Sequence, residues 1–353
     1  MSTKPMSQTR MDVLVLWGGI LFSFVFTGII WLAGSWLTNV QRLPDAGPSW
    51  YYWQLAEPTF WTRATAWGSY LLHQVASWGM IYYAQTRVKR YTSGLHPINI
   101  IALATNAAFV LIHFIQTHIW YDGLAQDTTI FSSQGSVILM LVWILLMENR
   151  RRGLFFGQPA PIKDEIIRAA RKYHGYVFSW AIIYTFWYHP MENSSGHLIG
   201  FFYTFLLLLQ GSLFFTRIHI NRWWTVTLEL MVLIHGTLVA LMQKGITGFW
   251  PMFFFGFLGI FIITQMHGLG LSLRARWLLF LGYAGSVVGI YSWRGWDQVS
   301  EIVRIPLIEY ILVFVLAGAI WLIGGLIGRF KPRTPQPQQT PVRSLKSTAQ
   351  ESS

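Results

Sequence analysis

The sequence has no cysteine and few charged residues. Without cysteine the chain cannot form disulfide bonds or use a thiolate as nucleophile or metal ligand, so imidazole and carboxylate groups are the ligands that remain. Charged residues make up 11% of the 353 residues, whereas an average soluble domain has about 25%. Hydrophobic residues make up 53%, and there are 19 tryptophans, a residue that favours the membrane–water boundary. This composition predicts an integral membrane protein.

The motifs of several common enzyme classes are missing as well. The sequence has no Walker motif, no dinucleotide-binding fingerprint and no nucleophile elbow. It has neither a His-Glu-x-x-His motif nor the histidine-box spacing of membrane desaturases. Covalent attachment of haem through Cys-x-x-Cys-His is impossible without cysteine. A zinc hydrolase of the common kind is therefore not indicated.

Apolar runs long enough to cross a bilayer recur along the chain. A spanning helix needs roughly 20 apolar residues. The predicted spans lie near 13–34, 64–85, 98–121, 128–147, 174–189, 197–217, 222–243, 248–268, 276–295 and 306–328. The sequence therefore predicts an all-α, polytopic helical bundle of about ten transmembrane helices, forming one domain over residues 1–330. Residues 331–353, rich in Pro, Gln, Ser and Thr, are predicted to be a disordered cytoplasmic tail.

The basic residues alternate from loop to loop. Every second loop is rich in Lys and Arg, as shown by Arg87, Lys89, Arg90, Arg150, Arg151, Arg152, Arg217, Arg222, Arg274 and Arg276. By the positive-inside rule these loops and both termini are cytoplasmic. This topology accounts for the net charge of +12, so nucleic acid is not an expected partner and membrane lipids are. We expect a multi-pass protein of the plasma (inner) membrane.

The stretch His189–His197 is the densest in chemically active groups. It reads His-Pro-Met-Glu-Asn-Ser-Ser-Gly-His and lies between two long apolar runs. Pro190 and Gly196 permit a tight return between two spans. Two imidazoles and the Glu192 carboxyl are therefore expected at a turn on the outer side of the membrane.

Six of the ten histidines are predicted to lie in the outer half of the membrane. His118, His189 and His197 lie at or near the outer boundary, whereas His73, His113 and His235 share a layer roughly 10–14 Å below it, at 1.5 Å per helical residue. Ionisable residues within a membrane are costly and point to function. His118 and Asp122 are four residues apart, which on a helix would give His118 a carboxylate partner.

These residues predict a site assembled across several helices. A single histidine in a helical bundle is more often a hydrogen-bonded packing residue, but six in one half-membrane favour a ligand site. His73, His113 and His235 are candidates for binding a cofactor such as b-type haem, and His118, His189 and His197 for binding copper, iron or zinc. Glu192 and Asp122 are the candidate catalytic carboxylates. The protein would then be a membrane oxidoreductase or metalloenzyme acting on a lipid, quinone or other apolar substrate.

Two other functions remain open on the sequence alone. The histidine layer would also serve as the protonatable site of a proton-coupled transporter or channel. That function requires polar residues through the inner half, for which Glu229, Gln210 and Gln265 are candidates. The chain would otherwise be a non-catalytic subunit of a larger membrane complex.

Overall fold

The computed structural model describes residues 8–44, 46 and 53–329, and within them the regular structure is helical. The α-helices are α1 (Gln8–Ala33), α2 (Phe60–Arg87), α3 (Pro97–Ile119), α4 (Ile130–Arg152), α5 (Asp164–Tyr188), α6 (Ser195–Ser212), α7 (Arg222–Lys244), α8 (Trp250–Ile263), α9 (Leu273–Arg294) and α10 (Arg304–Arg329). Short 3₁₀ segments follow several of them: η1 (Gly34–Leu37), η2 (Leu124–Gln126), η3 (Gln265–Gly268) and η4 (Trp296–Val303).

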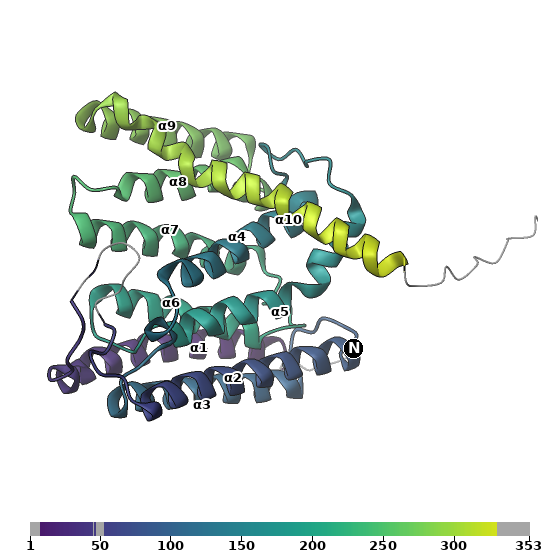
Figure 1. Cartoon of the computed structure of the whole chain (residues 1–353). Coiled ribbons are helices and arrows are strands. Elements are labelled where there is room, and N and C mark those ends of the chain that lie inside the picture. The colour runs from purple at the N-terminus through teal and green to yellow at the C-terminus, as the bar shows by residue number, and fades with distance from the viewer. Residues whose placement is uncertain (1–7, 45, 47–52, 330–353) are drawn as a thin grey trace, which may run out of the picture.

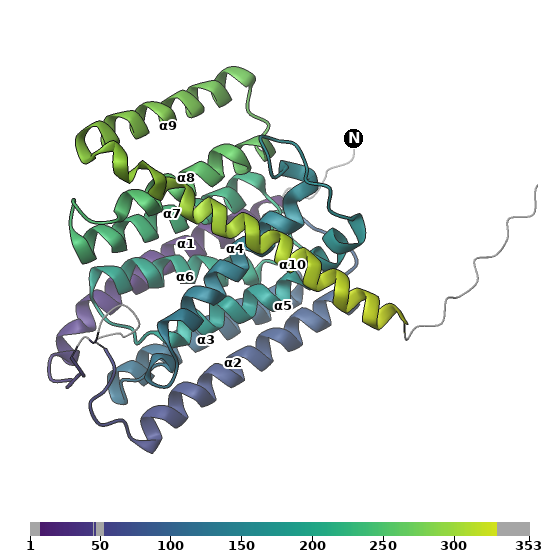
Figure 2. The ribbon, with the colours of Figure 1, turned by 45° about the horizontal axis from the view of Figure 1, so that its top comes forward.

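Most helices run side by side, so that their connecting loops gather at two ends of a bundle (Figure 1). The helices α1, α2, α3, α5 and α6 form one part, in which α1 packs on α6 and α2 packs on α3 and α5. The helices α7, α8 and α9 continue the bundle away from that part, and α10 crosses obliquely over α4 (Figure 2).

Six helical segments of the described chain are long and apolar enough to cross a membrane. They are Met11–Leu37, Pro97–Ile119, Ile130–Arg152, Arg222–Lys244, Trp250–Gly268 and Trp296–Gly328. Many large apolar side chains on them face outward, including Trp17, Leu21 and Leu322, as expected where lipid replaces water as the solvent. The prediction of an all-α chain is thereby confirmed, and six of its helices are able to cross a membrane by length and composition. Ten spans and cytoplasmic termini stay predictions, and the predicted tail, 331–353, lies outside the described residues.

The fifth helix is longer than the apolar pattern indicates. The sequence predicts a span over 174–189, with 162–172 as either a surface helix or a connecting loop. In the structure Asp164–Tyr188 is one continuous helix. Its first turns bury Ile166 and Ile167 in an apolar cluster with α4 and α10. Packing by tertiary neighbours, rather than length of the apolar run, therefore decides where this helix begins.

The largest core cluster lies beneath the loops at one end of the bundle. Its centre is formed by Phe186, Trp187 and Tyr188, the last turn of α5, whose side chains are fully buried. The turn 189–194 follows directly and leads into α6. A rigid aromatic core therefore holds this polar turn in a fixed place.

Candidate functional site

The carboxyl group of Glu192 lies at the centre of a buried polar network. A terminal nitrogen of Arg42 lies 2.6 Å from Glu192 Oε1. The Tyr121 hydroxyl donates to the same carboxyl oxygen, and Arg42 Nε donates to the Tyr121 oxygen at 2.9 Å. The Glu192 side chain is only 5% exposed and that of Arg42 30%. The Glu192 carboxyl, in the segment after α5, thus contacts Arg42 in the segment after α1 and Tyr121 in the segment after α3.

An unusual backbone conformation brings Tyr121 into this network. Helix α3 ends at Ile119, and Tyr121 has a φ of 43°, in the left-handed region that non-glycine residues seldom adopt. The strained turn directs the phenol inward, where it is 4% exposed. Burial raises the pKa of Tyr121 above its usual value, and the Glu192 carboxylate raises it further. The phenol therefore stays protonated and acts as a hydrogen-bond donor.

His197 contacts Glu192 from the first turn of α6. Its Nδ1 lies 2.6 Å from the Ser194 hydroxyl and 3.8 Å from Glu192 Oε2. A catalytic serine triad needs its acid and its serine on opposite ring nitrogens, whereas here both lie at Nδ1. Ser194 also accepts from the His197 backbone N–H as the N-cap of α6. The geometry supports capping and orientation of the imidazole, and excludes a serine triad.

Three imidazoles gather above and beside the start of α6. The rings of His189 and His197 are 5.6 Å apart, and Trp53 lies against both, at 5.2 and 4.9 Å between ring centroids. His235, on α7, approaches α6 at Gly200, where an added Cβ would be 3.3 Å from its ring. His197 Nε2 and His235 Nδ1 are buried without a hydrogen-bond partner among the described residues.

His73 and His113 form a second group around Trp187. The Trp187 indole N–H donates to His73 Nδ1 at 3.2 Å, and His73 Nε2 lies 2.8 Å from the Asn106 side-chain oxygen. His113 stacks on Trp187 at 4.3 Å, and its side chain is fully buried. His113 also lies near His189, and His189 near His197 and His235, so the two groups of histidines adjoin. A shared ligand layer of His73, His113 and His235 stays a prediction.

The predicted pairing of His118 with Asp122 is wrong. That pairing assumed one continuous helix through both residues, but α3 ends at Ile119 and the chain turns sharply at Tyr121. His118 Nδ1 instead lies 2.7 Å from the Phe114 carbonyl, and its ring packs against Trp36. Asp122 accepts from the Gly123 backbone N–H at 2.8 Å.

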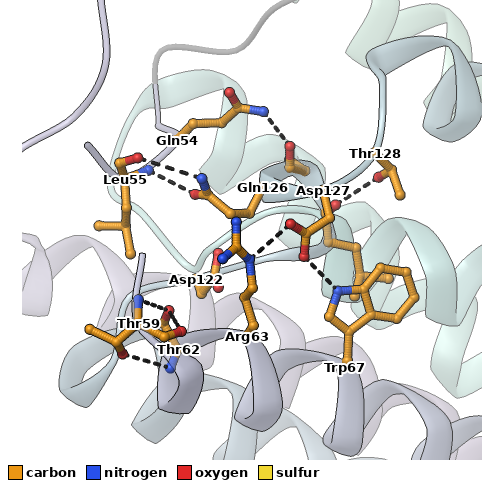
Figure 3. Close-up of polar contacts among 12 residues, drawn as sticks. Gln54, Leu55, Thr59, Thr62, Arg63, Trp67, Asp122, Gln126, Asp127 and Thr128 are labelled. Carbon is orange, nitrogen blue, oxygen red and sulfur yellow. Dashed lines mark hydrogen bonds and ion pairs between the residues drawn. The ribbon is translucent and has the colours of Figure 1, made fainter. Parts of the chain in front are cut away.

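Asp122 lies close to a second polar group at this end of the bundle (Figure 3). In that group Arg63 Nε and the Trp67 indole donate to Asp127 at 2.9 and 3.0 Å. The Gln126 side chain accepts from the Leu55 backbone N–H at 2.9 Å. The start of α2 and the loop before α4 are thereby joined. These contacts stabilise the loop between α3 and α4 in which Asp122 lies.

The pH dependence of stability tests whether the Asp122 carboxyl is buried as described. Burial raises the pKa of its carboxyl to about 6 from 3.8, so the folded state holds a proton that the unfolded state has released. Stability should therefore fall as pH rises from about 4 to about 6. We expect Asp122→Asn to remove this pH dependence. Between pH 4 and pH 7, the difference in free energy of unfolding between the variant and the wild type should therefore shift by about 2–3 kcal/mol in favour of the variant. Denaturant unfolding in detergent across this range measures it.

A matched variant at an exposed carboxyl controls for the other acidic residues. Glu57 is exposed in the same region of the chain, so Glu57→Gln should keep the pH slope of the wild type. If Asp122→Asn keeps that slope as well, the Asp122 carboxyl is not buried as described.

The predicted metal and haem ligands do not form a recognisable metal centre. The described residues contain no group of three or more His, Asp or Glu side chains placed to hold a metal ion. His118 faces Trp36 and Phe114, whereas His189 and His197 face Trp53. Binding of a metal by these three histidines, or of b-type haem by the deeper ones, stays a prediction.

A cavity opens beside the Glu192 network. Its volume is about 450 Å³. Its walls combine apolar and polar groups, namely Trp31, Leu32, Gly34, Ser35, Leu37, Thr38, Arg42 and Asn193. Trp31 and Leu32 are 60% and 68% exposed on the outer surface of α1. Arg42 belongs to both the cavity wall and the buried network. This open cavity therefore lies between the exposed apolar surface of α1 and Arg42, the residue that pairs with Glu192.

The fold and this site define an α-helical membrane protein with a buried polar network at one end of its bundle. Comparison of the chain with protein-family models, with curated proteins and with solved structures finds no match. The function is therefore argued from the residues of the chain itself.

Sequence reasoning missed three members of the network: Arg42, Trp53 and Tyr121. Arg42 is a single basic residue in a loop that the charge pattern places on the outer side of the membrane. A lone arginine of this kind is only a weak signal in the sequence. Trp53 and Tyr121 resemble ordinary interfacial aromatics. Their roles depend on contacts between segments at least 70 residues apart, which no local pattern reveals.

Proposed function

We propose that the protein is a plasma-membrane protein of ten spans with both termini in the cytoplasm. The six apolar segments support part of this topology. The helices α2, α5, α6 and α9 would supply the other spans, because they lie alongside the six in the same bundle (Figure 1). The Glu192 network would then lie near the outer face. Its partners would be membrane lipids and, if the chain is a subunit, other proteins of a membrane complex.

We further propose that the cavity takes an amphipathic, lipid- or quinone-type substrate from the bilayer. The observation that supports this best is the position of Arg42, which lines the cavity and contacts the Glu192 carboxylate. The apolar part of the substrate would pack on Trp31 and Leu32, and its polar group would lie near Arg42 and Asn193. Pockets of 300–1,000 Å³ with a few placed polar groups are typical of small-molecule sites.

The residues of the network would act by proton transfer. Glu192 is the candidate general acid or base, because it is buried and surrounded by donors. Tyr121 and Arg42 would hold its charge and orientation. His197 lies 3.8 Å from the same carboxyl and would pass protons toward the other imidazoles. A metal ion or haem bound by the histidines would add redox chemistry to this proton transfer. Visible absorption spectra and the metal content of the purified protein would test for such a group.

Photolabelling of the reconstituted protein tests the substrate proposal. Two probes are compared, a photoactivatable quinone analogue and a photoactivatable anionic phospholipid. We expect saturable labelling at residues that line the cavity. Ser35→Trp, which fills the cavity without touching the ion pair, should reduce labelling about tenfold, as should Arg42→Met, which removes a charge-assisted contact.

Arg63→Met is the matched control. Arg63 is a partly exposed arginine paired with Asp127 in the same end of the bundle, and its replacement should leave labelling unchanged. The preferred probe identifies the polar group that the site accepts. Labelling that does not saturate, or that is equal in the wild type and Ser35→Trp, would overturn the proposal.

A further inference from the structure

Another polar group, different from the Glu192 network and from the group around Asp127, lies inside the bundle. Helices α4, α7, α8 and α10, with η3, surround a small cavity of about 20 Å³. Its walls are mostly apolar, with Leu141, Ile144, Leu145, Leu230, Leu233, Phe257 and Ile260. Three polar residues also line it: Glu229, Gln265 and Glu309. Three oxygen-bearing side chains around a small, mostly apolar space require an explanation.

The charge of Glu229 is already compensated. Both terminal nitrogens of Arg152 donate to its carboxylate, one of them at 2.7 Å from Glu229 Oε1. The side chains are 5% and 6% exposed, and Arg152 Nε also lies 3.7 Å from Glu148. Such a two-pronged pair leaves no positive charge for a further carboxylate.

Glu309 has no such partner. It is 3% exposed, and no hydrogen bond or ion pair joins its carboxyl to another residue of the described chain. The other charged groups on the elements packed against α10 are either ion-paired or exposed. The ion pairs are Arg150 with Asp164, Arg151 with Glu148, and Glu301 with Arg294 of α9. The exposed groups are Glu165, Arg168, Arg171, Lys172 and Asp297. The neighbouring Tyr310 hydroxyl donates to the Leu154 carbonyl. An isolated ionised carboxylate in such surroundings would be very costly.

The size of the cavity limits what it holds. A space of about 10–15 Å³ on this scale accommodates one water molecule, so about 20 Å³ suits one water and no organic ligand. A water needs two to four polar partners, which Glu309, Gln265 and Glu229 supply. A metal cation in the same space would be repelled by the Arg152 guanidinium bound to Glu229.

We propose that Glu309 is protonated in the folded protein and hydrogen-bonded to one water molecule held in this cavity. The neutral carboxyl donates to the water, and the water donates to Gln265 and Glu229. The site thus binds an exchangeable proton inside the bundle, far along the chain from Glu192. It is independent of the proposed substrate site.

Infrared difference spectroscopy of the full-length protein tests this proposal. A protonated carboxyl gives a carbonyl-stretch band that an ionised one lacks. We expect the wild type to show such a band, Glu309→Gln to lose it and Glu309→Asp to shift it. Transfer to D₂O should shift the wild-type band, because the proton exchanges through the cavity water. Glu165→Gln, at an exposed carboxyl on α5, is the control and should leave the band unchanged.

Stability measurements distinguish a proton from a cation. Glutamine has the shape of a neutral glutamic acid, so Glu309→Gln should unfold at nearly the wild-type temperature, in sodium chloride and in choline chloride alike. The comparison is made near pH 8, where Asp122 is ionised. A band of unchanged intensity in Glu309→Gln would show that Glu309 contributes no protonated carboxyl and would overturn the proposal. Sodium-dependent stabilisation of the wild type that is lost in Glu309→Gln would overturn it in favour of a bound cation. Should Glu309→Gln fail to fold, an unshifted band in Glu309→Asp would overturn it equally.

Discussion

Replacing Glu192 with alanine is expected to lower the free energy of unfolding by about 3 kcal/mol. The variant removes the carboxylate that accepts from both Arg42 and Tyr121. Loss of one partner of a largely buried ion pair is costly because the charge of the other partner is no longer compensated by it. Because Glu192 joins three separate segments, the loops around the cavity should also become more open to proteases. Denaturant unfolding in detergent and limited proteolysis measure the two effects.

One further variant separates the charge of Glu192 from its hydrogen bond, and a second serves as a control. Glu192→Gln keeps an acceptor for the Tyr121 hydroxyl but loses the charge that pairs with Arg42, so its loss of stability should be intermediate. It should also abolish any turnover that depends on proton transfer at this carboxyl. Glu57→Ala, at an exposed position of the same region, should change stability by less than about 0.5 kcal/mol. An equally small change in Glu192→Ala would contradict the network.

Replacing Arg152 with methionine is expected to cost about 3–5 kcal/mol. The variant leaves the Glu229 carboxylate buried, 6% exposed, without its two donors. The double variant Arg152→Met, Glu229→Leu removes both charges and fills the space with apolar groups, so it should recover most of that stability. Thermal and denaturant unfolding of the four members of this cycle give the coupling between the two side chains.

An exposed ion pair between the end of α4 and the start of α5 serves as the comparison. Arg150 and Asp164 are 48% and 58% exposed, so Arg150→Met should cost less than about 1 kcal/mol. If the double variant at Arg152 and Glu229 is no more stable than Arg152→Met alone, the buried pair has a role in packing that its charge does not explain.

Much of the helical pattern could be predicted from the sequence. Long apolar runs place most helices within a few residues of their observed bounds, because burial in lipid or core demands such runs. The start of α5 at Asp164 could not be predicted in this way. Its first turns are polar outside and bury only Ile166, Ile167 and Ala170, so they follow from packing on α4 and α10.

The candidate site could be predicted only in part. The turn that carries Glu192, His189 and His197 is visible as a polar interruption between apolar runs. The end of α3 before Asp122 is not visible, because the apolar pattern continues to Tyr121 and the left-handed turn there involves no glycine or proline. Glu309 has a readable signal, since it is a single carboxyl in a long apolar run, but a lone carboxyl is a weaker indication of a site than six histidines are.

The Arg42–Glu192 contact also sets an order for biogenesis. The two residues are 150 positions apart (192 − 42), so at about 5–20 residues per second the ribosome needs roughly 8–30 s to make the second after the first. During that time α1 to α4 have emerged, while the loop carrying Arg42 lacks its acceptor. The contact forms only when the turn after α5 arrives. A chain that stops before residue 192 therefore cannot form this contact.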